Sequence, residues 1–338
     1  MGKIIVSVII PYYQGKRTIL ECLNALDNQD NAPAFEILVV DDSGKKEMAT
    51  SRFSPKNYCL RRIFQKHKGQ SAATNNGIKQ ARGKIVLLFA QDMIASPGLL
   101  KEHIATHGRL NSPGLAVLGY MPFHPDLPKS DFQDFLLSGP QFDYVSIKDK
   151  TYIDSANYFY APNISLQRDY LLKNGLFDED LVYGYQDIEL GRRLMAKGLQ
   201  FYFNKQALAY HHHLITLDSF CKKQKLMGKQ LRVLHKKHPQ FKSEEHLWFL
   251  REIIGRKDIA VFAKSFLESE DVNKKDKSLR QTAQVMSGLK SETARNIVSI
   301  LIRSAGKPDL VRHLTPIFYR LILFYYSSQG YFGKHVAD

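Results

Sequence analysis

Cysteine is scarce in this chain, with three residues among 338. Cys22, Cys59 and Cys221 are widely separated and form no paired spacing. Disulfide frameworks and cysteine-based zinc sites need cysteines at short, regular intervals, so the sequence argues against both. Unpaired cysteines are typical of a reducing compartment, and we therefore expect a cytoplasmic location.

Long apolar runs are missing from the start of the chain. The segment MGKIIVSVIIPYY carries one lysine and only a short apolar stretch before Pro11. A secretory signal or a membrane span needs a longer apolar core, and we expect neither in this segment. Internal repeats and low-complexity tracts are also absent, and with 44% hydrophobic residues the chain can bury a full core.

Acidic residues are few in the C-terminal part. Residues 1–204 hold 24 Lys and Arg against 21 Asp and Glu, whereas residues 205–338 hold 24 against 12. A basic face attracts anionic partners, so an anionic membrane surface, a phosphorylated or acidic substrate and nucleic acid are all compatible with this composition. The sequence has no recognisable nucleic-acid-binding module and no aromatics interleaved as stacking platforms, so we expect no nucleic-acid partner.

Short apolar runs alternate with amphipathic segments over the first hundred residues. The runs predict buried strands at residues 4–11, 35–43, 61–65 and 84–92. The amphipathic segments predict helices at residues 17–28, 71–80 and 96–107. Strands that alternate with helices at this spacing form right-handed βαβ units, so we predict an α/β fold with an open, mostly parallel sheet flanked by helices.

The pattern changes further along the chain. Residues 120–150 are rich in Pro, Asp and Phe and are predicted to form a loop or lid. Beyond residue 214 the pattern predicts helices, first at 220–235 and then over 244–304. We therefore expect a catalytic α/β domain at residues 1–215 and a basic, mainly helical region at 216–338.

Polar groups follow three of the predicted strands. Pro11 and Tyr13 lie after the first, Asp41 and Asp42 after the second, and Asp92 at the end of the fourth. Ligands of open parallel sheets bind beyond the carboxyl ends of the strands, so this edge is the predicted site. Asp41 and Asp42 can hydrogen-bond a base or ribose, or cap a turn. Asp92 can bind a divalent cation that bridges a diphosphate, or cap a helix.

Further candidates lie between residues 176 and 213. Asp187 stands in the first turn of a predicted helix, where it can act as a general base or simply complement the helix macrodipole. Three histidines, 211–213, follow a strand-like segment. Consecutive strand residues point to opposite faces, so at most His211 and His213 share one side, as metal ligands or as structural histidines.

Five segments carry a family resemblance. They are VSVIIPYYQGKRTILECLNAL, EILVVDDS, GQSAATNNGIKQARGKIVLLFAQDMIASPGLLKEHIATH, APNISLQRDYLLKNGLFDEDLVYGYQDIELGRRLMAKG and ALAYHHH. In this order, over about residues 5–240, they resemble family 2 glycosyltransferases of the GT-A fold. The resemblance implies a Rossmann-like domain that moves a sugar from a nucleotide-sugar, expected to be UDP-linked, to a hydroxyl of a glycan or glycolipid with inversion.

The resemblance also implies roles for individual residues. Asp187 resembles the catalytic base, and Asp92 with His211 resembles the ligand pair of a Mn²⁺ or Mg²⁺ ion. Gly77 belongs to the segment expected beside the nucleotide. The implied nucleotide site consists of Pro11, Tyr13, Asp41, Asp42, Gly69, Asn75, Gln91 and Asp92.

Three positions depart from the family pattern. Ala90 replaces the first Asp of the metal motif, Gln186 replaces the Glu before Asp187, and Thr74 stands where an Arg is often found. Since Asp92 and Asp187 are both present, an active enzyme with weaker metal affinity is the expectation. The alternative is a homologue that binds a nucleotide-sugar or glycan without turnover.

Two further hypotheses concern the ends of the chain. A nucleotidyltransferase would need a Gly-rich phosphate loop with Arg and Lys after the first strand, and PYYQGKRT offers only Gly15. Residues 314–332 are aromatic and apolar but interrupted by Arg320, Ser and Gly. With the basic helices before it, this tail could dock at the inner face of the plasma membrane or pack as a terminal helix.

Overall fold

The computed structural model describes residues 3–44, 50, 53–137, 139 and 141–241, together with positions 323, 327 and 330. The chain divides into two compact units, Met1–Leu214 and Ile215–Asp338. The helices predicted over 244–304 and the tail at 314–332 lie outside the described residues, apart from the isolated positions 323, 327 and 330. The roles predicted for the two parts of the chain stay predictions.

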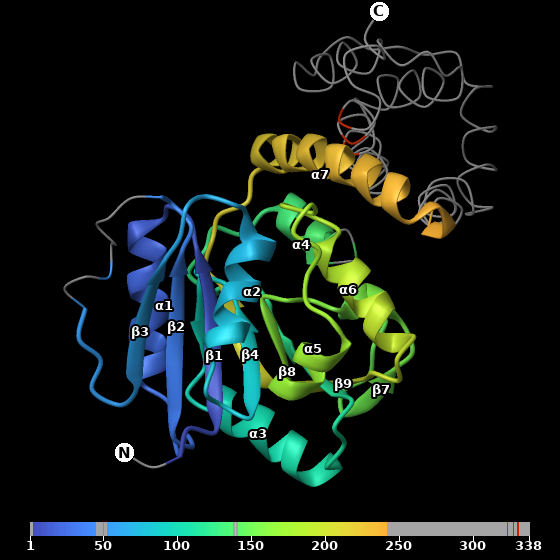
Figure 1. The fold of residues 1–338 in the computed structure, drawn as a ribbon. Helices are drawn as coiled ribbons and strands as arrows, with labels where there is room; N and C mark the ends of the chain where they lie inside the picture. The colour runs from blue at the N-terminus through green and yellow to red at the C-terminus, as the bar shows by residue number, and fades with distance from the viewer. Residues whose placement is uncertain are drawn as a thin grey trace, which may run out of the picture. The chain divides into compact units, whose positions relative to one another are not determined.

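The first unit is built on one nine-stranded sheet (Figure 1). Its first half has the order β3-β2-β1-β4 with all neighbours parallel. The second half continues through β8, β6, β9 and β5, where only β6 and β9 run parallel, and β7 pairs with β9. The strands are β1 (Val6–Tyr12), β2 (Phe35–Asp41), β3 (Cys59–Phe64), β4 (Ile85–Phe89), β5 (Met93–Ala95), β6 (Leu115–Tyr120), β7 (Thr151–Ile153), β8 (Asn163–Gln167) and β9 (Gln200–His211).

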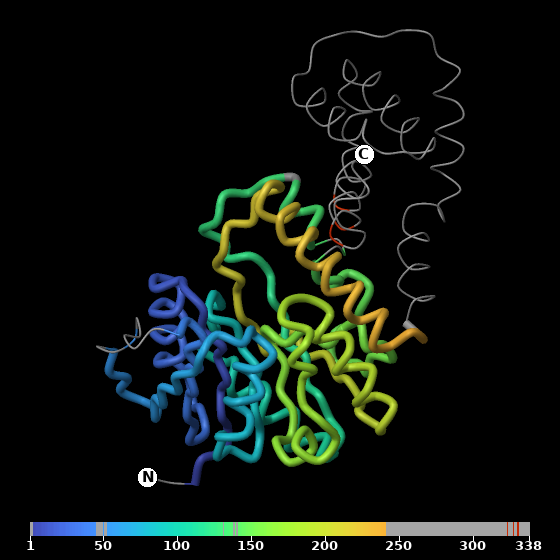
Figure 2. Tube along the Cα trace, turned by 45° about the horizontal axis from the view of Figure 1, so that its top comes forward, coloured from blue at the N-terminus to red at the C-terminus, as the bar shows by residue number. Residues whose placement is uncertain are grey.

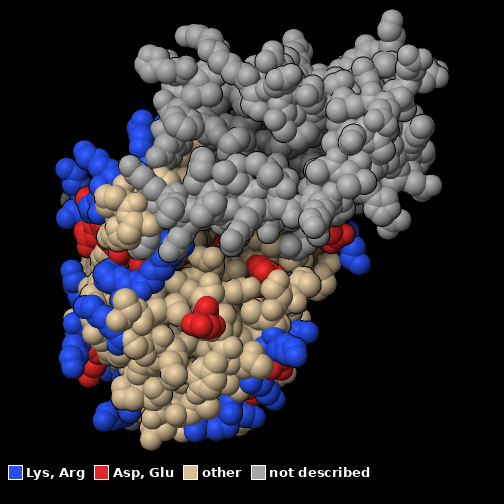
Figure 3. All heavy atoms as spheres, turned by 90° about the vertical axis from the view of Figure 1, so that its right-hand side faces the viewer, with Lys and Arg blue, Asp and Glu red and all other residues tan. Residues whose placement is uncertain are grey.

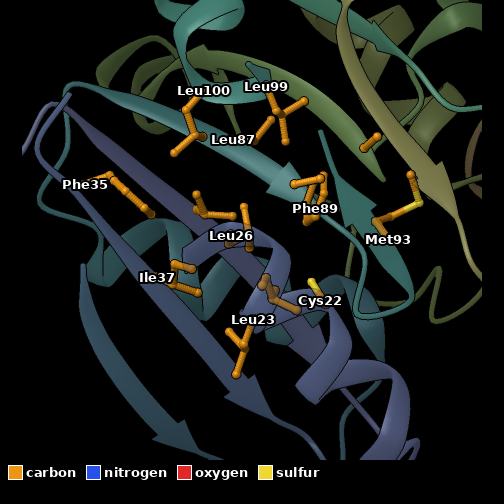
Figure 4. Close-up of a cluster of buried hydrophobic side chains, with 14 of the residues drawn as sticks. Cys22, Leu23, Leu26, Phe35, Ile37, Leu87, Phe89, Met93, Leu99 and Leu100 are labelled. Atoms are coloured by element: carbon orange, nitrogen blue, oxygen red, sulfur yellow. The ribbon is translucent and has the colours of Figure 1, made fainter. Parts of the chain in front are cut away.

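Helices cover both faces of this sheet because the central strands bury side chains in both directions. On one face, Ile10 and Leu87 pack with side chains of α1 and α3 (Figure 4). On the other, Ile9 and Leu88 pack with side chains of α2, α5 and α6. The helices are α1 (Lys16–Asp27), α2 (Gln70–Gln80), α3 (Leu99–Leu110), α4 (Asp131–Leu137), α5 (Arg168–Asn174) and α6 (Gln186–Met195), with a 3-10 turn at Ala156–Tyr158.

The predicted α/β fold with a sheet flanked by helices is confirmed, but the sheet is mixed rather than mostly parallel, because β5, β7 and β8 pair antiparallel with their neighbours. A second correction lies near the site. The strand predicted at 84–92 ends at Phe89, and the chain turns through Ala90 to Asp92 before β5. The turn is closed by a hydrogen bond from the Met93 amide to the Ala90 carbonyl at 3.4 Å. Asp92 therefore lies in a tight turn rather than on a strand, because β5 reverses to pair antiparallel with β9.

The segment predicted as a loop or lid is a long excursion between β6 and β8 that includes α4 and β7. Figure 2 follows it, in green, away from the sheet and back. Its second part is anchored, since the Tyr144 hydroxyl donates to the Gly119 carbonyl at 3.1 Å and the Asp143 amide donates to the Tyr160 hydroxyl at 3.1 Å. Burial raises the pKa of Tyr144 well above its usual value, so this phenol stays a hydrogen-bond donor. The anchored part is thus a fixed element of the first unit.

The second unit begins with α7 (Leu217–Lys237), followed by a 3-10 turn at Pro239–Phe241. The helix starts with a capping box, in which the Thr216 side chain accepts from the Ser219 amide and the Ser219 side chain accepts from the Thr216 amide. Within the part of the chain that the structure describes, no helix combines the length and the apolar character that a bilayer span requires.

Candidate active site

The predicted site residues gather at one edge of the first unit. Tyr13, Asp42 and the turn that ends at Asp92 follow the carboxyl ends of β1, β2 and β4, three neighbouring parallel strands. Two distant segments reach the same edge: His211 ends β9 beside β5, and the residues before α6 pack on α2. The topology therefore unites most of the implied site residues.

Gln91 holds the loop after β1. Its Oε1 accepts from the Tyr13 amide at 3.0 Å, and its Nε2 donates to the Gln14 carbonyl at 2.8 Å. The loop passes through two left-handed positions, Gln14 at φ 59° and Gly15 at φ 90°. A Cβ on Gly15 would lie 2.5 Å from Nε2 of Gln91, so glycine is required there. Gln91 thus positions Tyr13, whatever further contact it makes with a ligand.

Asp42 is only 2% exposed as a residue, and its carboxylate oxygens are engaged by groups of the protein itself. Oδ1 accepts from Gln65 Nε2 and the Lys68 amide, both at 2.8 Å. Oδ2 accepts from the Gly69 amide and lies against His67 Nδ1, also both at 2.8 Å. Asp42 therefore organises the turn between β3 and α2, and its direct contact with a nucleotide stays a prediction.

Asp41 is buried beside it at the end of β2. Its Oδ1 accepts from the Ser43 amide at 2.8 Å, which is the turn-capping role considered from the sequence. Its Oδ2 is buried and has no hydrogen-bond partner among the described residues. Burial, and then the charge of Asp41, raise the pKa of Tyr12. Ligand contact by Asp41 also stays a prediction.

His67 is a site residue that the sequence reasoning did not identify. Its ring stacks on Tyr13, with centroids 4.6 Å apart and planes 29° apart. Both side chains are open to solvent, Tyr13 as a residue 49% exposed and the His67 side chain 56% exposed. The pair forms an aromatic platform beside the buried Asp42. The sequence did hold a signal for this role. His67 follows the carboxyl end of β3, which runs parallel to β2, the strand that ends at Asp41.

Residues 175–185, which include Asp178, Glu179 and Asp180, form the loop before α6, and we call it the acidic loop. The segment 69–77 holds this loop in place. Asn75 is 3% exposed; its Nδ2 donates to the Phe177 carbonyl at 2.9 Å and its Oδ1 accepts from the Phe177 amide at 2.9 Å. The Ser71 hydroxyl donates to the Leu181 carbonyl. A Cβ on Gly69 would lie 2.9 Å from Cβ of Val182, and one on Gly77 would lie 2.4 Å from Ile9. Asn75 and Ser71 thus position the backbone of the loop before α6. The contact with a nucleotide that was predicted for this segment stays a prediction.

Asp187 lies in the first turn of α6, after Gly184 at φ 84° and Tyr185 at φ 63°. Its Oδ2 accepts from the Ala161 amide at 3.2 Å. Farther along the helix, Glu189 and Arg193 form a two-point ion pair at 2.8 and 2.9 Å, and Arg193 also donates to the Leu176 carbonyl at 2.7 Å. The acidic loop is therefore fixed at both ends, and the Asp187 carboxylate is half-buried at a helix N-terminus, where a negative charge is favoured.

Asp92 and His211 form the second half of the site. Nε2 of His211 lies 3.6 Å from Oδ2 of Asp92, because β5 and β9 pair with Met93 opposite His211. His212 turns the other way, with Nδ1 3.1 Å from Glu21 Oε2, as strand alternation requires. Tyr183 lies nearby: burial, and then the charge of Asp92, raise its pKa. Tyr183 of the acidic loop is therefore within electrostatic range of Asp92.

A carboxylate and an imidazole 3.6 Å apart are a donor set that fits a divalent cation such as Mn²⁺. The described residues contain no group of three or more His, Cys, Asp or Glu side chains that could hold a metal ion. Asp92 and His211 would supply two ligands, and diphosphate and water oxygens would supply others, as is usual for cations bound with phosphates.

Comparison with known proteins agrees with this architecture. The uncharacterized glycosyltransferase YfnE of Bacillus subtilis is 27% identical over 253 residues, which cover 61% of this chain and 64% of that protein, less than two-thirds of its length. The mannosyltransferase PcManGT from Pyrobaculum calidifontis, solved with GDP-Man and Mn²⁺, has a TM-score of 0.57 at 15% identity over 97% of this chain and 87% of its own. Staphylococcus aureus TarS 1–349 with UDP has a TM-score of 0.50 at 17% identity, over 96% and 91%.

These likenesses and the sheet define a GT-A fold. Residues 7–126 match the family model described as Glycosyl transferase family 2. This match spans 120 of the 338 residues.

Proposed function

We propose that this protein is an inverting glycosyltransferase that moves a sugar from a UDP-linked donor to a hydroxyl group of a glycan or lipid-linked glycan. The observation that carries the proposal is a pair of candidate groups: Asp187, held by the Ala161 amide at 3.2 Å, and Asp92 with His211, whose side chains lie 3.6 Å apart. One carboxylate is placed to accept a proton, and the other site suits a diphosphate with its cation.

Asp187 takes the proton of the acceptor hydroxyl as its oxygen forms a bond to the anomeric carbon. The bond from that carbon to the diphosphate oxygen breaks, and the nucleoside diphosphate leaves with the electron pair. No second carboxylate is assigned as a nucleophile, so a single displacement with inversion is expected. A divalent cation, when bound at Asp92 and His211, supplies a Lewis acid for the leaving diphosphate.

The Tyr13–His67 platform suits the nucleobase. Stacked rings that are half-exposed at the carboxyl edge of parallel strands offer a flat apolar surface. Pro11 lies on β1, the strand that leads to Tyr13. Gln91 fixes the loop that follows β1 through its bond to the Tyr13 amide. The two structural neighbours were solved with UDP and with GDP-Man and Mn²⁺, and we propose UDP for this chain.

The acceptor would approach along the anchored segment near residues 141–160. Tyr160 precedes Ala161, whose amide binds Asp187, and the Tyr158 hydroxyl donates to Asp143 Oδ2 at 3.1 Å. Aromatic rings and a carboxylate suit sugar rings and hydroxyls. We place the reaction in cell-surface polysaccharide or glycoconjugate synthesis, in the cytoplasm and peripherally at the inner face of the plasma membrane.

The experiment is a donor screen with the purified full chain. UDP-linked and GDP-linked sugars are incubated with Mn²⁺, Mg²⁺ or EDTA, and released nucleoside diphosphate is measured with and without glycan acceptors. We expect release from a UDP-sugar that depends on a divalent cation. Release only from GDP-sugars would overturn the choice of donor, and activity undiminished by EDTA would overturn the metal dependence.

A second candidate function is a homologue that binds nucleotide-sugar or glycan without turnover. The observation that favours it is Gln186, which replaces the family Glu, is buried, and has an Oε1 without a hydrogen-bond partner among the described residues. Binding of a UDP-sugar without release of UDP in the same screen would support this function and exclude the first.

A further inference from the structure

The helix α7 presents one face made of basic residues. Its exposed Lys and Arg recur at intervals of three or four residues, the spacing that places side chains along one side of an α-helix. We call five of them the basic stripe: Lys222, Lys225, Lys229, Arg232 and Lys236. Asp218 is the one acidic residue in α7, and it pairs with Lys222 at 2.7 Å at the start of the stripe. The other four residues of the stripe have no acidic neighbour within the helix.

The other side of α7 is buried. Its buried residues are Phe220, Cys221, Gly228, Leu234 and His235. A helix whose apolar side is already covered cannot lay that side into a bilayer, as amphipathic membrane helices do. The stripe residues and Leu226 are exposed, so this side of the helix can meet a partner through its charges and that one apolar side chain.

The shape of the stripe selects the kind of partner. From Lys222 to Lys236 the helix rises about 21 Å at 1.5 Å per residue, with roughly one positive charge per turn along a line. A flat anionic surface can meet all five charges at once. Single-stranded nucleic acid needs aromatic stacking platforms, and the one aromatic residue of α7, Phe220, is buried.

The charged residues of the first unit are arranged differently on the face seen in Figure 3. There Lys and Arg lie mainly around the margin, and the middle is mostly uncharged with isolated acidic residues. The linear array on α7 is therefore a local feature, in the part of the chain that carries the excess of positive charge.

We propose that the basic stripe of α7 binds the surface of an anionic lipid bilayer. Each Lys or Arg near such a surface contributes about 1 kcal/mol, which is roughly a fivefold factor in partitioning. The attraction is screened beyond a Debye length of about 10 Å at 0.1 M salt and about 3 Å at 1 M. The contact is thus reversible and sensitive to salt, and it does not depend on the identity of the donor or acceptor.

Vesicle co-sedimentation with the full chain tests this. Vesicles of phosphatidylcholine alone are compared with vesicles of phosphatidylcholine and phosphatidylglycerol in equal amounts, at low and high salt. We expect binding only to the anionic vesicles, with loss at high salt. Replacement of all five stripe residues by Gln is expected to lower the partition coefficient by more than about a hundredfold.

A matched variant controls for the loss of five charges. It replaces five exposed lysines of the first unit by Gln: Lys56, Lys79, Lys101, Lys148 and Lys173. This control should retain most of the vesicle binding, and circular dichroism should show that both variants keep the helical content of the parent. Equal loss in both variants, equal binding to both kinds of vesicle, or binding to single-stranded nucleic acid without binding to anionic vesicles would each overturn the proposal.

Discussion

The carboxamide of Asn75 exchanges two hydrogen bonds with the backbone of Phe177, each at 2.9 Å, across 102 positions of the sequence. Its Nδ2 also lies 3.0 Å from Glu179 Oε1. Through these bonds α2, which lies at the proposed nucleotide site, holds the start of the acidic loop that leads to Asp187. A residue expected to touch the nucleotide thus has a defined part in placing the proposed base.

Replacement of Asn75 by Ala should therefore impair catalysis as well as stability. It leaves the buried amide and carbonyl of Phe177 unsatisfied, which costs about 1–3 kcal/mol of unfolding free energy. Because the loop is loosened, kcat should fall at least about tenfold. Unfolding in urea and initial rates measure the two effects. Asn174→Ala, which removes a bond within one helix, is the control; similar loss of kcat in both variants would contradict the role of Asn75.

The Tyr13–His67 platform leads to a prediction about donor binding. His67→Ala removes one stacked ring together with its anchor on Asp42, so we expect KM for the donor to rise about tenfold with little change in kcat. Isothermal titration with UDP should show the same loss of affinity. His238→Ala, at the end of α7 in the second unit, is a comparison that leaves the platform and the proposed cation site intact. A fall in kcat at unchanged KM would argue against contact with the nucleobase.

Asp187→Asn tests the proposed base directly. The amide keeps the shape of the side chain but cannot accept the proton, so kcat for transfer should fall by about 10²–10⁴. Binding of UDP should be nearly unchanged, because the substitution lies away from the platform. Asp169→Asn, another acid in the first turn of a helix, should retain activity. Full transfer by the Asp187 variant would refute the assignment.

Two buried histidines on α3 predict sensitivity to acid. His103 bonds to Ser165 Oγ and Asn163 Oδ1 at 2.8 and 2.9 Å, and His107 bonds to Ser165 Oγ at 2.9 Å. Burial lowers the pKa of both to about 4 from the usual 6.5, and for His107 the charge of His103 adds to this. The unfolded chain therefore binds protons more readily than the folded one. The stability that the folded protein gains from keeping both histidines neutral is complete above pH 6.5. It is lost as the pH falls toward 4.

Between pH 6.5 and pH 4, the free energy of unfolding should fall by on the order of 3 kcal/mol for each histidine. Thermal unfolding recorded from pH 8 to pH 4 should show a nearly constant midpoint down to about pH 6.5 and a steep decline below it. A variant with both histidines replaced by Gln should be less stable at neutral pH but show a shallower decline. An equally steep decline in that variant would assign the effect to other groups.

The sequence predicted the strands that bury both faces, because runs such as that around Ile9 are apolar over their whole length. It also placed Asp42 and Asp187 at element ends, which depends only on local pattern. It did not predict β5, since three residues are too few to show a period, and so it put Asp92 on a strand.

Long-range side-chain partners were likewise beyond local patterns. The clamp of Gln91 on Tyr13 and the stacking of His67 on Tyr13 join residues that are 78 and 54 positions apart. Only the parallel alignment of β1 with β4, and of β1, β2 and β3, brings these loops together, and that alignment is a property of the whole sheet. The hydrogen bonds of Asp42 to the segment after β3 depend on the same alignment, because β2 and β3 end side by side.

Cation binding at Asp92 and His211 gives the last prediction. If Asp92 and His211 are the two ligands that the described residues provide, Mn²⁺ alone should bind weakly, and UDP should raise its affinity by providing phosphate oxygens. Asp92→Asn and His211→Gln should each weaken Mn²⁺ binding in the presence of UDP by about 10- to 100-fold, because each removes one of only two protein ligands. Electron paramagnetic resonance of free Mn²⁺ measures this without reference to activity. His212→Gln, whose imidazole faces Glu21, is the matched control. Equal Mn²⁺ affinity in all three variants would place the cation elsewhere.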